Sequence, residues 1–109
     1  MLAKKYRLPI QTVLKQKSGH SFKSRYFLFK IFSSDLPFSR FGLIVSKKIS
    51  KKAVDRNRIK RLVFNYLRKN ISLNRKNSKS DDVLIITMKN IPEKEKLEAI
   101  EDLSSMFNN

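Results

Sequence analysis

The residues best suited to chemistry in this sequence are the cations between Lys47 and Arg61. In these fifteen positions the chain carries five lysines and three arginines against a single acid, Asp55. Arginine offers a planar fork that can hold a phosphate or a guanine edge through two hydrogen bonds, whereas lysine is a point charge on a flexible stem. A solvated helix face normally interleaves acids with bases, so this composition indicates a surface that binds a polyanion.

An apolar stripe overlaps the cations and predicts a helix. Its members recur at the spacing of one buried helix face: Ile59, Leu62, Val63, Tyr66 and Leu67. The stripe should anchor the helix, so that Asn57, Arg61 and Arg68 point outward with Lys60 and Arg58 flanking them. Upstream, the connection from the preceding strand adds four further cations beside the helix N-terminus, where backbone N–H groups favour an anion: Lys47, Lys48, Lys51 and Lys52.

The charge of the whole chain supports the same interpretation. Its 109 residues hold 25 lysines and arginines and 9 acids, a net charge of +16. Residues 1–80 carry +20 and residues 81–109 carry −4. A polyanionic partner would relieve this self-repulsion, nucleic acid first and an anionic membrane surface second. The chain lacks cysteine, an apolar run of roughly 18 residues and a secretory-type start, so we expect one cytoplasmic domain over 1–109.

The pattern along the chain predicts an α+β fold in two layers. We expect helices over 8–17, around the apolar stripe at 59–67 and over 91–107, and strands over 22–32, 40–48 and 81–88. Residues 22–32 and 40–48 should form a hairpin, and 81–88 should be central because both of its faces are apolar. In the first strand Phe27, Phe29 and Ile31 should face one way and Lys30 the other. On the last helix Leu97, Ile100, Leu103 and Phe107 should line one side.

Residues 40–62, "RFGLIVSKKISKKAVDRNRIKRL", resemble the signature of the bacterial ribonuclease P protein subunit. In that family a strand ending in V-S-K-K leads through a basic connection and A-V into an R-N-R-x-K-R helix. The matching positions are Arg40, Gly42, Val45, Ser46, Lys47, Lys48, Ala53, Val54, Arg56, Asn57, Arg58, Lys60 and Arg61. The order of the other predicted elements is similar to the family's over nearly the whole chain.

The resemblance implies a fold and an activity. The fold would have the order α-β-β-β-α-β-α, with a four-stranded mixed sheet, three helices and a left-handed β-α-β crossover through the basic helix. The subunit would join a catalytic RNA that removes the 5′ leader from precursor tRNA, with Mg²⁺ held mainly by the RNA and the substrate. The partners would be this RNA and precursor tRNA, with no membrane and no obligate protein partner.

The resemblance also implies two sets of site residues. Contact with the catalytic RNA would use Lys47, Lys48, Lys51, Lys52, Arg56, Asn57, Arg58, Lys60, Arg61 and Arg68. A cleft for the single-stranded leader would use Ile10, Leu14, Phe27, Phe29, Lys30 and Ser46. The family usually places phenylalanines where Ile10 and Leu14 stand, and stacking on a base is worth about 1–3 kcal/mol. Leader contacts should therefore depend on charge more than on stacking. Ser50 stands where glycine is common in the family.

The sequence predicts no catalytic or metal site in the protein itself. Protein nucleases usually need clustered carboxylates or a poised histidine. The single histidine, His20, should be a surface residue, and Asp81 and Asp82 should be turn and solubility residues on opposite faces of a strand. The acids of the last helix should face solvent: Glu93, Glu95, Glu98, Glu101 and Asp102.

Three alternatives to the ribonuclease P hypothesis differ in class. A structural RNA binder such as a ribosomal protein suits the composition equally well. A helix-turn-helix DNA reader needs a second helix packed by a tight turn against the basic one, whereas a strand directly precedes it here. Binding to a membrane surface would need the apolar stripe to be free, although the sheet needs that stripe as core.

Overall fold

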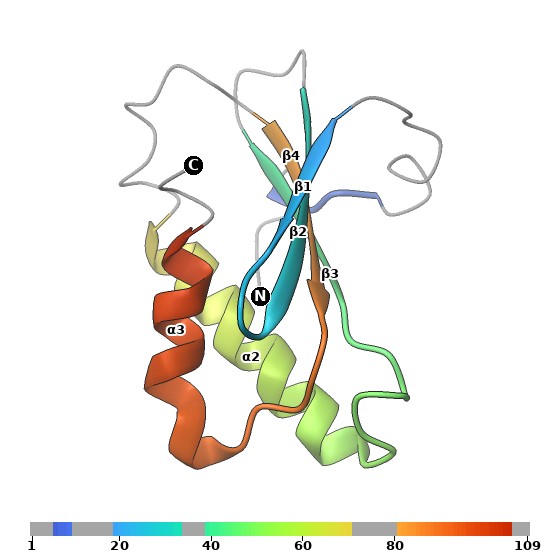
Figure 1. The fold of residues 1–109 in the computed structure, drawn as a ribbon, viewed down its shortest axis with the longest axis vertical. Helices are drawn as coiled ribbons and strands as arrows, with labels where there is room; N and C mark the ends of the chain where they lie inside the picture. The colour runs from blue at the N-terminus through green and yellow to red at the C-terminus, as the bar shows by residue number, and fades with distance from the viewer. Residues whose placement is uncertain (1–5, 10–18, 34–38, 71–80, 106–109) are drawn as a thin grey trace.

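A four-stranded mixed sheet with helices packed on one face forms the body of the protein (Figure 1). The structure is a computed structural model, and it describes residues 6–9, 19–33, 39–70 and 81–105. The strands are β1 (His20–Lys23), β2 (Phe27–Ser33), β3 (Arg40–Ile44) and β4 (Asp81–Thr87). Helix α2 spans Ala53–Asn70, and a 3₁₀ turn η2 (Glu93–Glu95) leads into α3 (Lys96–Ser104). The helix predicted over 8–17 falls mostly outside the described residues.

The strand order is β1-β2-β4-β3. β4 pairs antiparallel with β2 and parallel with β3, so its predicted central position is confirmed. The predicted hairpin between residues 22–32 and 40–48 is wrong, because β4 lies between β2 and β3. The hairpin is instead formed by β1 and β2, which turn at Ser24–Tyr26 within what the sequence pattern indicated as one strand. Neither glycine nor proline marks this turn, and its one turn-favouring residue is Ser24, so the local sequence signal for it is weak.

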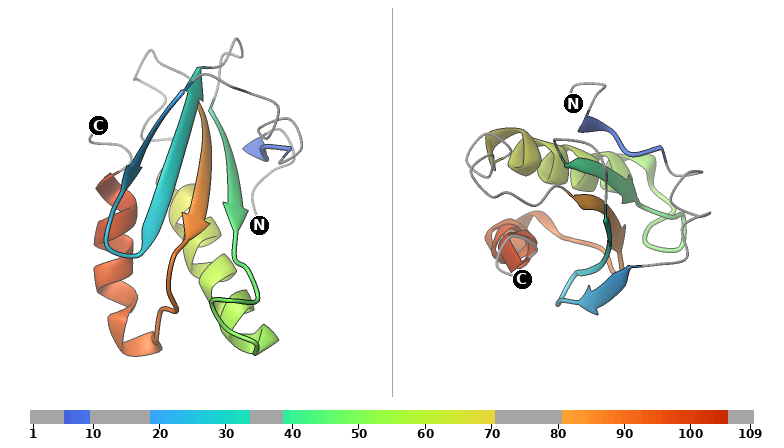
Figure 2. Two further views of the ribbon diagram at one scale, coloured as in Figure 1. Left: turned by 45° about the vertical axis from the view of Figure 1, so that its right-hand side comes forward. Right: turned by 90° about the horizontal axis from the view of Figure 1, so that it is seen from above.

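Both helices cover the same face of the sheet, as the view from above in Figure 2 shows. The core between sheet and helices unites alternate residues of the strands with the apolar stripes of the helices: Phe27, Phe29, Ile31, Phe41, Val83 and Ile85 with Ile59, Val63, Leu67, Ala99 and Leu103. The predicted alternation in β2 is therefore confirmed. Phe22 of β1 adds a ring stacked on Phe29, with centroids 5.0 Å apart.

The opposite sheet face carries a smaller apolar cluster. Leu8 and Leu84 are buried there, and Phe32, Ile44 and Ile86 pack against them. Leu8 N–H donates to the carbonyl of Phe41 at 2.9 Å, which holds residues 6–9 along the edge of β3. Gly42 permits this approach, because an added Cβ would lie only 3.3 Å from Leu84 Cδ1 and 3.4 Å from Leu8 Cβ.

Asp82 is a buried ion-pair partner, so its prediction as a turn and solubility residue is wrong. It is 1% exposed, and Arg40 donates two hydrogen bonds to it, from Nε–H to Oδ1 at 3.0 Å and from Nη2–H to Oδ2 at 2.7 Å. These hydrogen bonds raise the pKa of Arg40 above its ordinary value. The pair joins neighbouring strands, since Arg40 and Asp82 lie directly opposite each other in the β3–β4 register.

Helix α3 differs from its prediction in two ways. Leu97 is 77% exposed, so it does not line the buried side, which is formed by Ala99 and Leu103 with Ile100 partly buried. Phe107 lies outside the described residues. The acids of this region were expected to face solvent, but Glu95, Glu98 and Asp102 bind the β1–β2 hairpin.

Asp102 holds the hairpin turn. It accepts hydrogen bonds from Ser24 Oγ at 2.6 Å, Tyr26 N at 2.7 Å and Arg25 N at 3.1 Å. The Tyr26 hydroxyl lies 2.5 Å from Glu95 Oε1 and 3.1 Å from Glu98 Oε2. These bonds secure a turn that has neither glycine nor proline, and they join the β1–β2 hairpin to α3.

Candidate RNA interface

Helix α2 presents its cations as the stripe predicted. Ile59, Val63 and Leu67 are 0% exposed and Leu62 is 9% exposed, so the helix is fixed to the sheet. The outward side chains are exposed: Asn57, Lys60, Arg61 and Arg68. Arg68 Nη2–H donates to Asn65 Oδ1 at 3.1 Å, one turn back along the helix. The helix, fixed to the sheet, therefore holds charges that no carboxylate of the described segments neutralises.

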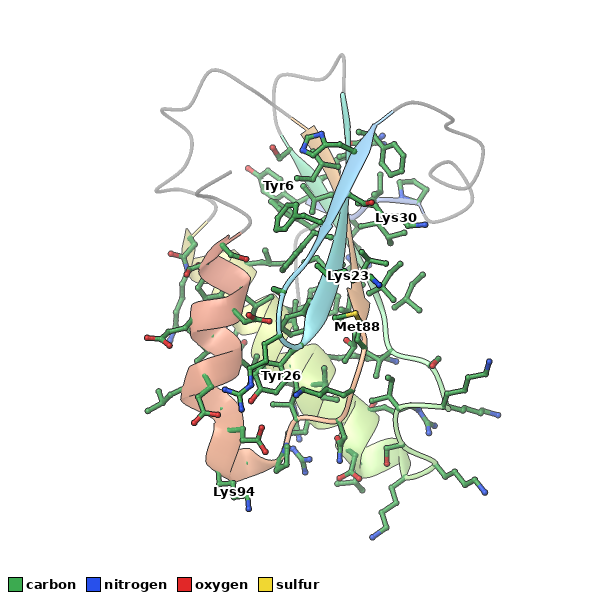
Figure 3. The ribbon with its side chains drawn as sticks, in the orientation of Figure 1. Tyr6, Lys23, Tyr26, Lys30, Met88 and Lys94 are labelled. Carbon is green, nitrogen blue, oxygen red and sulfur yellow. The ribbon has the colours of Figure 1, made fainter. Side chains whose placement is uncertain are left out.

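The connection between β3 and α2 extends the same surface. Its cations are exposed: Lys47, Lys48, Lys51 and Lys52. Figure 3 shows nitrogen-tipped side chains projecting away from this connection. We call these four lysines, with Asn57, Lys60, Arg61 and Arg68, the basic surface. Val54, 70% exposed in the first turn of α2, adds an apolar contact among its cations.

Arg56 and Arg58 are less available than the sequence suggested. Both are partly buried and bind the protein itself. Arg56 Nη1–H donates to the carbonyl of Ser50 at 2.7 Å. Arg58 Nη1 lies 3.1 Å from Asp55 Oδ1, and its Nη2–H donates to the carbonyl of Ile91 at 3.1 Å. Their guanidinium groups therefore already have intramolecular partners, and their contact with RNA stays a prediction.

Asp55 lies at the centre of these contacts. Its Oδ2 accepts from Ser50 Oγ at 2.8 Å, and Ser50 Oγ in turn accepts from Lys52 N–H at 3.2 Å. The hydrogen bond from Ser50, with the nearby Arg58, lowers the pKa of Asp55 below its ordinary value. The side chain is therefore ionised at neutral pH. Asp55 is also the one acid between residues 40 and 80.

The leader cleft predicted from the resemblance is only partly compatible with the structure. Phe27 and Phe29 are 0% exposed in the core beneath the helices, so their prediction as cleft residues is wrong. Lys30 and Ser46 are exposed, whereas Ile10 and Leu14 lie outside the described residues. The alternation of β2 already places Lys30 on the opposite face from the two phenylalanines. Assigning all three residues to one cleft from the family resemblance overlooked that signal.

The face of the sheet that bears Lys30 has its own candidate contacts. Leu28, Phe32 and Ile86 are partly buried there, and Met88 is 38% exposed. Lys23 of β1 lies opposite Leu28 and is exposed. Figure 3 shows Lys23, Lys30 and Met88 along this part of the sheet. The strands therefore combine two cations with apolar side chains on one face.

The carboxylates of the described residues are not arranged for a metal ion. No group of three or more His, Cys, Asp or Glu in these segments could hold one. Asp82 is bound to Arg40, Asp102 to the hairpin turn and Asp55 to Ser50 and Arg58. His20 is exposed at the start of β1, as predicted. No helix in the described segments is long and apolar enough to cross a membrane.

The fold and the basic surface together define a small α+β protein of the nucleic-acid-binding class. The sequence profile of the family described as Ribonuclease P matches residues 4–109. The chain belongs to this family of bacterial ribonuclease P protein components, and is thus a subunit of the ribonuclease P holoenzyme in tRNA processing.

Relatives and solved structures agree with this assignment. Ribonuclease P protein components from Desulforapulum autotrophicum and Fusobacterium nucleatum are 36% and 37% identical to this chain. Each alignment covers 84% of this chain, and 74% and 82% of the respective relative. The ribonuclease P protein from Thermotoga maritima superposes with a TM-score of 0.69 at 26% identity, covering 92% of this chain and 93% of that one. A Staphylococcus aureus ribonuclease P protein gives a TM-score of 0.71 at 25% identity, covering 94% and 93%.

Proposed function

We propose that this subunit binds the catalytic RNA of ribonuclease P through the basic surface and the 5′ leader of precursor tRNA through the sheet face that bears Lys30. In this way it assists removal of the leader in the cytoplasm. The observation that carries the proposal is a row of exposed cations, without carboxylate partners among the described residues, on a helix whose other side is fully buried. Such cations release counterions when they neutralise phosphates, which favours binding.

The protein's own part in the reaction is binding and positioning. Mg²⁺ bound by the RNA and the substrate would activate a water molecule and stabilise the leaving oxygen. Asp55, Asp82 and Asp102 are bound to protein groups, and the described residues contain no cluster of three or more acids or histidines that could hold that ion. Exposed Lys23 and Lys30 would hold leader phosphates, while Phe32 and Met88 offer apolar contact to bases. The proposal also includes two features of the family's fold. A helix near the start of the chain, which brings the number of helices to three, would close this cleft, and the β-α-β crossover through α2 would be left-handed.

Reconstitution tests the proposal directly. The chain is added to a cognate catalytic RNA at low Mg²⁺, and cleavage of precursor tRNA is followed. We expect faster cleavage with the chain than without it. The double variant Lys60→Ala/Arg61→Ala should lose much of this gain. Lys94→Ala/Lys96→Ala removes the same charge from exposed positions in η2 and α3, and should retain it. Equal loss in both variants would show that net charge alone, rather than the basic surface, is responsible.

The leader contact has its own readout. Holoenzyme affinity is measured for precursor tRNA and for mature tRNA, which lacks the leader. Lys30→Ala should weaken binding of the precursor alone, because a phosphate contact to the leader is lost. Lys94→Ala is the matched control. A Lys30→Ala holoenzyme that keeps the same preference for the precursor would remove this face of the sheet from the proposal.

A further inference from the structure

An acid stands inside the basic surface, where charge alone would exclude it. Asp55 is flanked in sequence by Lys51, Lys52, Arg56 and Arg58. Its ionised carboxylate weakens the attraction of this region for phosphate. If the region served only to gather positive charge, a neutral residue would serve better. The contacts of Asp55 show what it supplies instead.

Asp55 joins two segments directly and a third through Arg58. Its Oδ2 binds Ser50 Oγ in the connection between β3 and α2, and its Oδ1 binds Arg58 one turn further along α2. Arg58 continues to the carbonyl of Ile91, in the loop that enters η2. Arg56 returns from α2 to the carbonyl of Ser50. We call Ser50, Asp55, Arg56 and Arg58 the brace.

The brace fixes the part of the connection that bears lysines. Ser50 is held by three hydrogen bonds. Its hydroxyl donates to Asp55 and accepts from Lys52 N–H, and its carbonyl accepts from Arg56. Lys51 and Lys52 follow it directly, and Lys48 lies two residues before it. The side chains of these lysines are exposed, so only the backbone beneath them is held. Order imposed before binding lowers the entropy lost when a loop meets its partner.

We propose that Asp55 is a positioning residue, which holds Ser50, Arg56 and Arg58 so that the lysines of the connection are preorganised for the catalytic RNA. The inference rests on the proposed function and deepens it. It divides the cations of this region into two groups. The lysines of the basic surface, with Arg61 and Arg68, neutralise phosphates, whereas Arg56 and Arg58 hold the protein surface in shape.

Asp55→Asn distinguishes this proposal from simple electrostatic attraction, because the two predict opposite changes in affinity for the catalytic RNA. The substitution removes one negative charge, so attraction alone predicts tighter binding of the catalytic RNA. The brace predicts binding weaker by about 2- to 10-fold, the range for one lost hydrogen bond. The slope of log affinity against log salt should be unchanged, since no phosphate contact is removed. Glu101→Gln makes the same charge change on the exposed side of α3 and should not weaken binding.

Ser50 provides a second test without any change of charge. Ser50→Ala should weaken binding to a similar extent at an unchanged salt slope, and Ser50→Thr, which keeps a hydroxyl, should restore it. Circular dichroism confirms that each variant is folded at the temperature of the binding assay. Unchanged or tighter binding by both Asp55→Asn and Ser50→Ala would overturn the inference while leaving the proposed function intact. Failure of the unaltered chain to bind the catalytic RNA would instead overturn the proposed function.

Discussion

Helices α2 and α3 lay apolar stripes on the same face of the sheet, but they use their charges differently. The outward cations of α2 have no carboxylate partner among the described residues, although Asp55 binds the more deeply placed Arg58. The acids in and before α3 bind the β1–β2 hairpin through Tyr26, Ser24 and Arg25. In the view of Figure 1, α3 lies to the left of α2 and the connection that precedes α2 lies to its right.

The comparison shows that a charged helix face indicates an external partner only when its side chains lack internal ones. Both helices have charge runs in sequence, and the sequence pattern assigned both to the outside. For Arg61 the structure agrees, because the side chain is exposed with no ion pair among the described segments. For Asp102 it does not, since three donors surround the carboxylate. Glu98 and Asp102 of α3, with Glu95 just before it, therefore hold the hairpin in place and are not available to neutralise the basic surface.

The largest effect should come from removing the hairpin contact of α3. Asp102→Ala leaves three donors at the turn without their acceptor, and should lower the free energy of unfolding by about 2–3 kcal/mol. Urea denaturation measures the loss. Glu101→Ala, one residue away and exposed, should change stability by less than about 0.5 kcal/mol. Similar losses of stability in the two variants would mean that Asp102 is an ordinary surface charge, and that α3 and α2 do not differ in how they use their charges.

Arg61→Ala should weaken RNA binding while leaving stability almost unchanged. Its side chain is exposed, so the free energy of unfolding should change little. Affinity for the catalytic RNA should fall, and the log–log salt slope should decrease by about 0.7–0.9 for the lost phosphate contact. Filter binding at several salt concentrations measures both. A slope equal to that of the unaltered chain would show that Arg61 meets no phosphate.

The smallest effect should be a dependence on alkaline pH. The hydrogen bond to Glu95, with burial and Glu98 adding to it, raises the pKa of Tyr26 above its ordinary value of about 10. The folded chain thus holds the hydroxyl proton more tightly than the unfolded chain. This contribution to stability is complete below about pH 10 and declines as the pH rises toward the folded pKa. Tyr26→Phe should be less stable at neutral pH, and its difference from the unaltered chain should narrow above about pH 10.

Thermal unfolding at a series of pH values measures that difference. Lysines also titrate in this range, but they are common to both proteins and cancel in the comparison. A difference that stays constant from neutral to alkaline pH would show that the Tyr26 hydroxyl contributes nothing to the junction between the hairpin and α3.

Sequence predicted the features that depend on local periodicity. The buried stripe of α2, the alternation of β2 and the central place of β4 all follow from spacing within single elements. The family resemblance added the mixed sheet, which the structure contains. Two assignments failed because they treated neighbours in sequence as neighbours in space: the hairpin between β2 and β3, and Phe27 and Phe29 as leader contacts.

Long-range polar partners were the features that spacing does not encode. Arg40 and Asp82 are 42 residues apart in the chain, and Ser24 and Asp102 are 78 apart. Each acid looks like an ordinary surface charge until its partner is known. Within the basic region the brace was also missed, although its members are near one another in sequence. Spacing placed Arg58 beside the exposed face, and did not show that Asp55 and the carbonyl of Ile91 engage it.

The position of β4 has a consequence for how the protein is made. The three strands that precede it in the chain emerge from the ribosome first, yet β2 and β3 have no direct pairing and meet only across β4. Because Asp102 must also arrive to secure the turn at Ser24, the nascent chain completes its tertiary structure only after residue 102 has left the exit tunnel. Until then the cationic segments lack a finished scaffold, so the basic surface takes its final shape only late in synthesis.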